Sequence, residues 1–458
     1  MAWLRPEIIS GVTRGTKEFF DKVLDGVAMA HSDVETLELE RSTGRLSEAA
    51  LNATYAPATL ATTVASKVSA QQIGALNVTN LAGLTRWGAA RGKAITGRAT
   101  ITVPSDSIGA GVGTDGNANE ITGPYDAAQQ AIYRERAWPV QLRKMLNNRV
   151  GVADQGLNWF GFRQGWNSGA VLAGATTSST LGPFGPYSAG GAGGISIPNG
   201  PDTVTLPAAS ALGKYTEISI PYWGSDAGVA SPCAPSVTID GVAQTVPQGA
   251  ASGMLNWLAF AGLADTTHEV VIGNSQSGRT FYGFGGCVYR SPTGFVVNRM
   301  GRPGATVVDI VGSNTAASKT RLLTSTAMPG VTDLLIPTFG TNDQSQQVPI
   351  AEYKSRLQDL IDTQVAGGGC VLLLGSPPAA NPTGAITEQM YRDAMKDLAL
   401  SNQHVAYTDV RSLWGTHAEG YSLGLVPIAS TVHPTAKAAG MIATALAELL
   451  TLPNYRAA

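Results

Sequence analysis

The order of apolar and polar positions divides the chain into parts with three different patterns. Between residues 293 and 452, runs of consecutive apolar residues alternate with stretches whose apolar residues recur every three or four positions. The first pattern is typical of strands buried on both faces, and the second of amphipathic helices. Their alternation predicts a parallel sheet covered by helices on both sides. The expected strands are 294–301, 332–340, 369–378 and 405–409, and the expected helices are 350–365, 387–402 and 434–450.

A shorter α/β stretch lies earlier in the chain. Strand-like residues 101–104 lead into the small-residue sequence "SDSIGAG", and a helical stretch follows at 125–152. The spacing there predicts one buried helix face. A strand followed by such a helix is the first half of a βαβ unit. The face comprises Trp138, Leu142, Leu146 and Val150.

Between these two α/β segments the pattern of apolar and polar residues is different. Residues 161–292 contain short alternating runs of Val, Ile, Thr and Tyr, separated by Gly, Pro, Asn and Asp. Many short strands with frequent turn signals predict an all-β sandwich, here of jelly-roll type. We therefore expect an α/β domain interrupted by an inserted β-sandwich.

The N-terminal residues match neither the α/β pattern nor the all-β pattern. Residues 16–51 begin with helical spacing and a narrow apolar stripe, which is typical of a helix that packs on a partner chain. Residues 52–95 are rich in Ala, Thr, Ser and Gly without a stable period, and we expect an extended or intertwined connector. The predicted parts are an N-terminal attachment and oligomerisation region at 1–95, α/β segments at 96–160 and 293–458, and the insert at 161–292.

The composition limits which kinds of molecule the protein is expected to bind. The 458 residues exceed what one compact core uses, so several domains are expected. The 31 Lys and Arg nearly balance the 33 Asp and Glu, which excludes the electrostatic footprint of a nucleic-acid or anionic-membrane binder and favours a neutral glycan or small ester.

The sequence has no export signal and no apolar run of ~20 residues, so we expect no membrane insertion and a cytoplasmic location by default. Three widely spaced cysteines indicate neither a disulfide framework nor a zinc site, although a bridge between Cys233 and Cys287 stays open.

Four polar stretches fall where predicted α/β strands end or where the last helix begins. The carboxyl ends of parallel strands meet at one edge of a sheet, so these stretches are expected to share one pocket. The stretches are "PSDSIGAG" at 104–111, "NRMGRPGAT" at 298–306, "FGTNDQ" at 339–344 and "STVHPTAKAAG" at 430–440.

These stretches make the chain resemble the SGNH hydrolases, also called the GDSL esterase superfamily. The four marker residues of that family match Ser107, Gly304, Asn342 and His433, in the family's order. The resemblance covers about residues 97–160 and 293–452. It implies a flavodoxin-like, three-layer α/β/α domain with a parallel sheet.

The resemblance also implies a role for each marker residue. Ser107 would attack an ester carbonyl with His433 as its base, since a serine hydroxyl needs an adjacent base and histidine titrates near neutral pH. The oxyanion would be held by the backbone N–H groups of Ser107 and Gly304 and by the amide of Asn342. Neither a cofactor nor a metal is expected. We further expect Asp106 and Asp343 to hold their loops by accepting backbone N–H bonds.

The sequence departs from the family pattern at two positions. Ser105 replaces the glycine that usually precedes the Asp-Ser pair, and Ser430 replaces the aspartate that usually stands three residues before the histidine. A triad aspartate orients the histidine, and its loss can cost ~10⁴-fold in rate. Three alternatives stay open: a backbone carbonyl near Ser430 orients His433, an acid such as Glu419 or Asp409 reaches in, or the enzyme is inactive.

Together these features predict a serine esterase that removes small acyl groups, mainly O-acetyl, from a polysaccharide on a bacterial surface. The sequence "GRLSEAALNATYAPA" at 44–58 resembles N-terminal segments of phage tail proteins, which implies a homotrimer located in a virion tail with other tail proteins as partners. The insert would bind carbohydrate or shape the substrate site. Two alternatives are a non-catalytic glycan-binding tail protein on an SGNH scaffold and a lipase-like esterase for long acyl chains. Aromatic residues that either stack on sugars or belong to the core are Trp159, Trp166, Tyr187, Tyr222, Trp223 and Tyr282.

Overall fold

The fold is described from a computed structural model of the chain. The structure describes residues 70–453 except for 74, 115–134, 153–158, 161–170, 174–175, 178–194, 198–199, 209–211, 224–232, 247–254, 276–280, 284, 302, 312–322, 325, 380–383 and 429–431. The predictions for residues 1–69, including the helix and the tail-like segment, lie outside the described residues.

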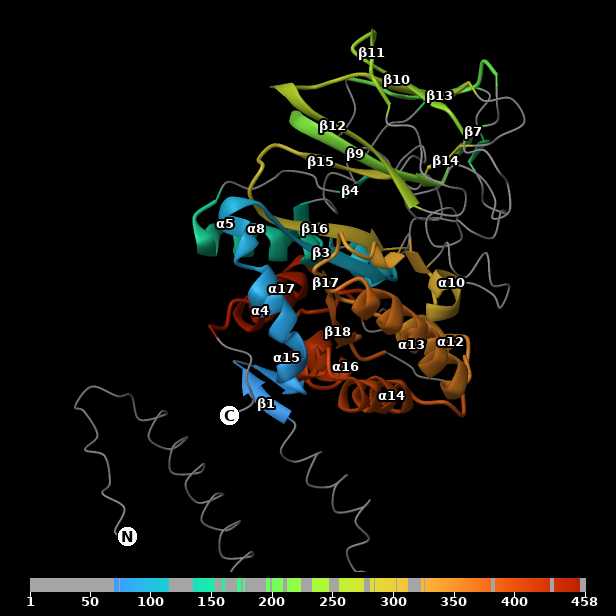
Figure 1. Ribbon diagram of the computed structural model, residues 1–458. Coiled ribbons are helices and arrows are strands. Elements are labelled where there is room, and N and C mark those ends of the chain that lie inside the picture. The colour runs from blue at the N-terminus through green and yellow to red at the C-terminus, as the bar shows by residue number, and fades with distance from the viewer. Residues whose placement is uncertain are drawn as a thin grey trace, which may run out of the picture. The chain divides into compact units, whose positions relative to one another are not determined.

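The first sheet contains seven strands in the order β1-β2-β19-β18-β17-β3-β16 (Figure 1). Strands β19, β18, β17, β3 and β16 are parallel, whereas β1 and β2 are antiparallel at one edge. The longer parallel strands are buried along almost their whole length, as expected for a sheet covered on both faces. Their bounds in sheet order are Ala70–Ile73, Leu76–Thr79, Val405–Asp409, Cys370–Gly375, Leu334–Leu335, Arg98–Ser105 and Gly294–Gly301.

The strand expected at 332–340 is regular only at β17. Beyond it the chain still follows β3, because Ile336 donates its N–H to the Thr102 carbonyl and Thr338 donates to the Pro104 carbonyl. Pro337, between them, has no N–H to give to the other neighbour, β18. The proline therefore shortens the strand while the chain keeps its course to the sheet edge.

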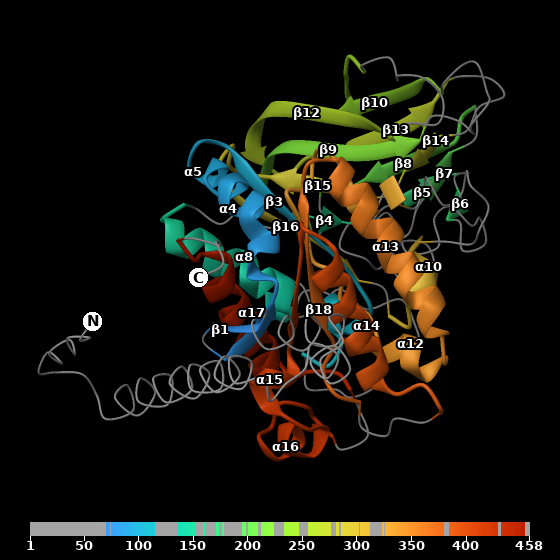
Figure 2. The same ribbon diagram turned by 60° about the horizontal axis from the view of Figure 1, so that its bottom comes forward.

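Helices cover both faces of this sheet, and two separate apolar cores lie between them and the strands (Figure 2). One face carries α8 and α17 with η1, α4 and α5, and the other carries α10, α13 and α14. On α8, the expected residues Trp138, Leu142 and Leu146 are buried, but Val150 is exposed where the helix ends. In the same order these helices span Trp138–Val150, Ala436–Leu450, Leu81–Leu84, Thr85–Ala90, Lys93–Thr96, Val307–Val311, Ile350–Ala366 and Glu388–Ser401; the short α6, α12, α15 and α16 span Ser107–Ala110, Thr341–Ser345, Arg411–Trp414 and His417–Ser422.

The expectation of a connector up to residue 95 is wrong for residues 70–95, which belong to the α/β domain. Strand β2 pairs with β19, and Trp87 is fully buried and donates its Nε1–H to the Leu450 carbonyl. Asn80 donates side-chain bonds to three carbonyls around α14 and β19. The elements here are only four to six residues long. Such short elements leave no sequence period to detect, and the many small residues reflect close packing rather than an extended linker.

The strands between β3 and β16 form two further sheets, all of whose pairings are antiparallel. One apolar core contains residues from both sheets, so the two sheets form a sandwich (Figure 1). Trp159–Phe160 pairs with β15, so this strand belongs to the sandwich although we expected it in the first α/β segment. One sheet contains β11 (Val242–Ala243), β10 (Pro235–Ile239), β13 (Val270–Asn274), β8 (Thr203–Leu206) and β5 (Val171–Ala173); the other contains β4 (Trp159–Phe160), β15 (Gly286–Tyr289), β9 (Tyr215–Trp223), β14 (Phe281–Gly283), β7 (Ile195–Ile197), β6 (Thr176–Thr177) and β12 (Leu255–Thr266).

Among the aromatic residues considered for sugar stacking, Tyr222 belongs to the core. Its ring is buried and stacks on Phe281 with the centroids 5.0 Å apart. The side chains of the other five lie outside the described residues. Jelly-roll connectivity and a carbohydrate-binding role of the sandwich therefore stay predictions.

The sandwich and the α/β part are joined by a partly buried polar contact and by shared apolar packing. Arg98 on β3 donates two hydrogen bonds to the Glu217 carboxylate on β9, at 2.8 and 2.7 Å, and lies 3.9 Å from the ring centroid of Tyr289. A bidentate arginine–carboxylate pair fixes geometry better than a single bond does. Cys287 and Tyr289 also pack with Val296 and Met300 of β16. The insert thus lies on the edge strand of the main sheet.

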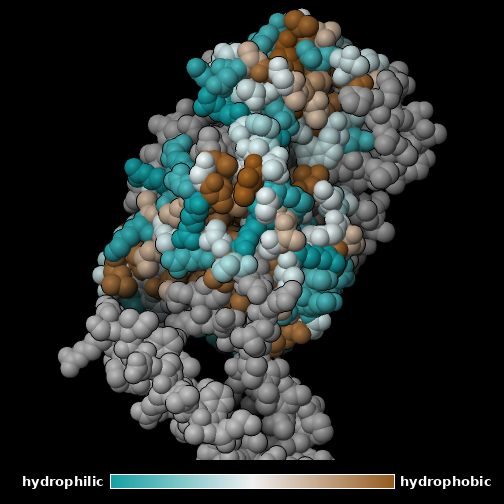
Figure 3. Space-filling view, turned by 60° about the vertical axis from the view of Figure 1, so that its left-hand side comes forward, coloured by the Kyte–Doolittle hydropathy of each residue, from teal (hydrophilic) through white to brown (hydrophobic). Residues whose placement is uncertain are grey.

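The described surface mixes polar and apolar residues on the face shown in Figure 3. The most exposed large apolar side chains are scattered over several elements, for example Ile95, Val242 and Leu423. No helix in the described part of the chain is long and apolar enough to cross a membrane.

A tight turn joins β3 to α6 at the carboxyl edge of the sheet. Ser105, the last residue of β3, is fully buried, and its Oγ has no hydrogen-bond partner among the described residues. A Cβ atom on Gly109 would lie 1.9 Å from that Oγ and 2.5 Å from the Ser105 Cβ. The serine that replaces the family's usual glycine therefore occupies space that Gly109 leaves free.

This packing predicts that Gly109→Ala destabilises the protein through Ser105. Overpacking a filled core site costs about 1–3 kcal/mol, and we expect a matching fall in Tm by differential scanning calorimetry. Ser105→Gly removes both clashing atoms, so the double variant should be more stable than Gly109→Ala alone. Equal losses in the single and double variants would contradict this account of the turn.

Candidate active site

Ser107 begins the short helix α6 directly after the end of β3. The preceding residue, Asp106, is fully buried and its Oδ1 accepts the N–H of Ile108 at 2.9 Å, which caps the helix. Gly111 ends the helix with a φ of 98°, a left-handed conformation that glycine adopts without strain. The Ser107 side chain is thus held on a rigid turn, and its N–H is one of the first-turn groups that have no partner within the helix.

His433 lies just before α17 and contacts Ser107. Its Nε2 is 2.9 Å from the Ser107 Oγ, although 326 residues separate the two in sequence. His433 is mostly buried. Thr435 anchors the segment, since its N–H donates to the Leu425 carbonyl and its Oγ1 accepts the Ala438 N–H at the start of α17. The pair has the geometry that a serine and its general base require.

Gly304 lies in the turn between β16 and α10, and Asn342 is the second residue of the short helix α12, at the same edge of the sheet. Gly304 has a φ of 75°, which favours glycine at this turn. Asn342 donates its Nδ2–H to the Ala305 carbonyl at 3.1 Å and lies 3.5 Å from Asp106 Oδ2. The Asn342 side chain thereby links the loop that carries Gly304 to the turn that carries Ser107.

The register of the sheet explains why these loops converge. Ser105 of β3 is in register with Gly301 of β16 on one side and forms a bridge to Thr338 on the other. Three strands therefore end at the same level, and the loops that follow them open into the same space. The parallel arrangement brings together residues that the chain separates widely.

Asp106 and Asp343 hold their loops through backbone bonds, as the sequence led us to expect. Asp343 Oδ1 accepts the Val307 N–H at 2.9 Å, and its Oδ2 accepts the Gly340 N–H at 3.0 Å. Burial raises the pKa of Asp343 to about 7, although the backbone N–H bonds oppose this rise.

Of the groups considered for orienting His433, two have other partners. Asp409 accepts the Arg411 N–H and the Tyr407 hydroxyl, and the Glu419 carboxylate caps α16. Both carboxylates line a groove between β19 and α14–α16 whose lining does not include His433. Both carboxylates are therefore hydrogen-bonded elsewhere, and no contact with His433 is needed to explain their positions. Ser430 lies outside the described residues, so the carbonyl alternative stays a prediction.

Sequence reasoning did not single out Gly113, which lies against the histidine. A Cβ atom on Gly113 would be 2.7 Å from the His433 Cβ and 3.1 Å from the Pro434 carbonyl oxygen. Gly113 also has a φ of 88°. The glycine-rich run after Ser107 was a signal for this close approach, but the sequence did not say which segment it would meet.

The other described histidines have different surroundings. Both ring nitrogens of His268 are hydrogen-bonded, to Asp240 and to the Ala264 carbonyl, and burial lowers the pKa of His404. His417 begins α16.

In the part of the chain that the structure describes, no cluster of three or more His, Cys, Asp or Glu side chains is placed to hold a metal. Cys233 and Cys287 are both free, so the bridge between them that the sequence left open is not formed.

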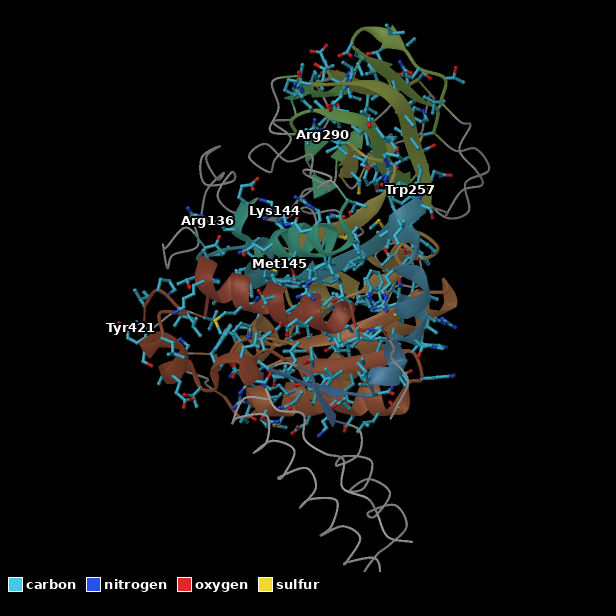
Figure 4. All side chains as sticks on the ribbon, turned by 90° about the vertical axis from the view of Figure 1, so that its left-hand side faces the viewer. Arg136, Lys144, Met145, Trp257, Arg290 and Tyr421 are labelled. Carbon is cyan, nitrogen blue, oxygen red and sulfur yellow. The ribbon has the colours of Figure 1, made fainter. Side chains whose placement is uncertain are left out.

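In Figure 4, Arg136, just before α8, and Tyr421, on α16, project from the same side of the ribbon. Arg136 donates to the Thr114 carbonyl at 3.4 Å, and Tyr421 is 46% exposed. This side of the domain therefore carries a charged side chain near α8 and an exposed aromatic ring on α16.

A comparison with known families and structures agrees with this geometry. The profile of the GDSL-like lipase/acylhydrolase family matches residues 271–440. That range includes Gly304, Asn342 and His433 but not Ser107, which the fold supplies from before the insert. No curated protein matches the chain in sequence.

Among the solved structures that match the chain, one superposes well enough to show a shared fold. A structure described as "Peptidoglycan O-acetylesterase in action, 5 min" is 17% identical, covers 81% of this chain and 97% of its own, and superposes with a TM-score of 0.53. A family two carbohydrate esterase from Clostridium thermocellum is 13% identical over 61% of this chain and 97% of its own, with a TM-score of 0.25. The likeness to the first structure shows a shared fold. Residues 271–440 thus match the profile of the GDSL-like lipase/acylhydrolase family, which supports a carboxylic ester hydrolase.

Proposed function

We propose that the protein is a serine esterase that removes small acyl groups, mainly O-acetyl, from a polysaccharide. The observation that carries the proposal is the 2.9 Å contact between Ser107 Oγ and His433 Nε2. This contact supports catalysis over the alternative of a purely glycan-binding scaffold, because a binding site has no use for a serine held against the ring nitrogen of a histidine.

In the first half of the reaction, His433 Nε2 accepts the Ser107 hydroxyl proton while Oγ attacks the acyl carbon. The negative charge moves to the carbonyl oxygen, where the Ser107 and Gly304 N–H groups and the Asn342 amide would bind it. The C–O bond to the sugar then breaks, and His433 returns the proton to the leaving sugar hydroxyl. The product of this half is an acyl-enzyme on Ser107.

In the second half, water takes the place of the sugar. His433 Nε2 removes a proton from the water as it attacks the acyl carbon, and the same donors bind the oxyanion again. Breaking the bond to Oγ releases the carboxylic acid, and His433 restores the hydroxyl proton to Ser107. The cycle uses the one ring nitrogen that faces Ser107 in the structure.

Three features support a glycan as the acyl carrier. The formal net charge of −2 favours a neutral substrate over a strongly charged one. A β-sandwich lies on the edge strand of the sheet that carries the site, where it can contact a long polymer. A structure with the same fold is described as a peptidoglycan O-acetylesterase.

We also propose that the protein acts in a phage tail at the surface of a bacterium. The proposal rests on the resemblance of residues 44–58 to phage tail segments and includes a homotrimer and other tail proteins as partners. An ester on a surface glycan is a substrate that a tail protein meets on adsorption. Size-exclusion chromatography with light scattering would test the trimer, and a monomeric full chain would contradict it.

Removing either member of the pair should abolish esterase activity without unfolding the protein. We expect Ser107→Ala and His433→Ala each to lower kcat for 4-nitrophenyl acetate by ~10⁴-fold or more, because nucleophile and base act as one unit. Matched controls are Ser401→Ala and His404→Gln, at the end of α14 and just before β19, which should keep kcat within about threefold. Activity that survives in both Ser107→Ala and His433→Ala would contradict the assignment.

The acyl specificity follows from the proposed substrate. We expect acetyl esters to react at least ~10-fold faster than octanoyl esters in kcat/KM, and acetate to be released from acetylated xylan or O-acetylated peptidoglycan. A series of 4-nitrophenyl esters and an acetate assay measure these quantities. A preference for long chains, with no acetate released from either glycan, would favour the lipase-like alternative instead.

A further inference from the structure

The buried carboxylate of Asp343 joins two loops that the proposed mechanism uses. Its Oδ1 accepts the N–H of Val307, the first residue of α10, at 2.9 Å, and its Oδ2 accepts the N–H of Gly340, the N-cap of its own helix α12, at 3.0 Å. Val307 follows Gly304 by three residues, and Gly340 precedes Asn342 by two. One side chain thus fixes the start of α12, which carries the Asn342 donor, and ties it to the start of α10, which follows the Gly304 donor.

Asp343 is itself held firmly. It has no exposed surface, and its backbone carbonyl accepts both the Tyr391 hydroxyl at 2.9 Å and the Val348 N–H at 2.9 Å. Tyr391 is almost fully buried on α14, so the bond to it ties the loop to the helical layer. A fixed carboxylate can therefore fix the two loops that it joins.

The arrangement is costly for stability, which indicates a role beyond packing. Burial and the nearby charge of Asp106 raise the pKa of Asp343 to about 7, against the effect of its N–H bonds. A carboxyl group whose folded-state pKa is raised destabilises the fold as pH rises through that value. A neutral side chain would avoid this cost, but it would not offer two acceptor oxygens to the two N–H groups.

We propose that Asp343 is a positioning residue of the oxyanion hole, which sets the Gly304 N–H and the Asn342 amide at the spacing that the oxyanion requires. The inference rests on the proposed esterase function. Asp343 touches neither the acyl group nor Ser107 in this account. It acts through the two loops, which the bond from Asn342 Nδ2 to the Ala305 carbonyl also links.

The test is Asp343→Asn, with Asp333→Asn as the matched control. Asp333 also binds a backbone N–H of another segment, that of Thr100 at 2.9 Å, but it lies near the opposite ends of the strands. We expect Asp343→Asn to lower kcat for 4-nitrophenyl acetate by ~10²-fold with KM within about threefold, since loss of one oxyanion donor has an effect of this size. Asp333→Asn should lower Tm but leave kcat unchanged.

A second variant serves if Asp343→Asn does not fold. Val307→Pro removes the N–H that Asp343 binds and keeps an apolar side chain at this buried position, and proline is tolerated there because Val307 is the first residue of α10. We expect kcat to fall by ~10-fold with KM unchanged. The inference is overturned if the folded variants keep kcat within threefold, or if KM rises while kcat is unchanged. A wild-type protein that hydrolyses no ester would instead overturn the proposed function, and the inference with it.

Discussion

The site depends on one hydrogen bond, between Ser107 Oγ and His433 Nε2, that the whole α/β fold is needed to make. Each partner lies at the end of a different segment, one after β3 and one before α17. Neither segment can place its side chain alone. The parallel sheet brings the two together because its strands end at one level and its helices return the chain to the same edge.

Small residues and buried acids contribute to the rigidity of this edge beside apolar packing. Gly109 and Gly113 allow backbone to approach Ser105 and His433 more closely than any side chain would permit. Asp106 and Asp343 satisfy N–H groups that the turns leave without partners. Both devices leave the Ser107 hydroxyl facing His433 with little freedom to move, which is the preorganisation that general-base catalysis needs.

Much of this could be predicted from the sequence. The alternation of apolar runs and helical periods predicted the four strands and the three long helices after residue 293, but not the short helices α10, α12, α15 and α16. The four marker stretches predicted which segments would meet. The pattern failed at residues 70–95, where elements are too short to show a period and are identified only by their contacts, such as that of Trp87 with Leu450. The sequence also could not predict that Gly113 lies against His433 or that Asp343 binds the Val307 N–H. Both contacts join segments that are far apart in the chain and meet only after folding.

The central claim is that Ser107 is a nucleophile activated by His433. The most direct measurement is covalent labelling with a fluorophosphonate probe, followed by mass spectrometry of the digested protein to locate the adduct. The account predicts one adduct per chain, on Ser107, and little labelling of His433→Ala under the same conditions. An esterase-active protein that carries no adduct on Ser107, or that is labelled at another residue, would contradict it.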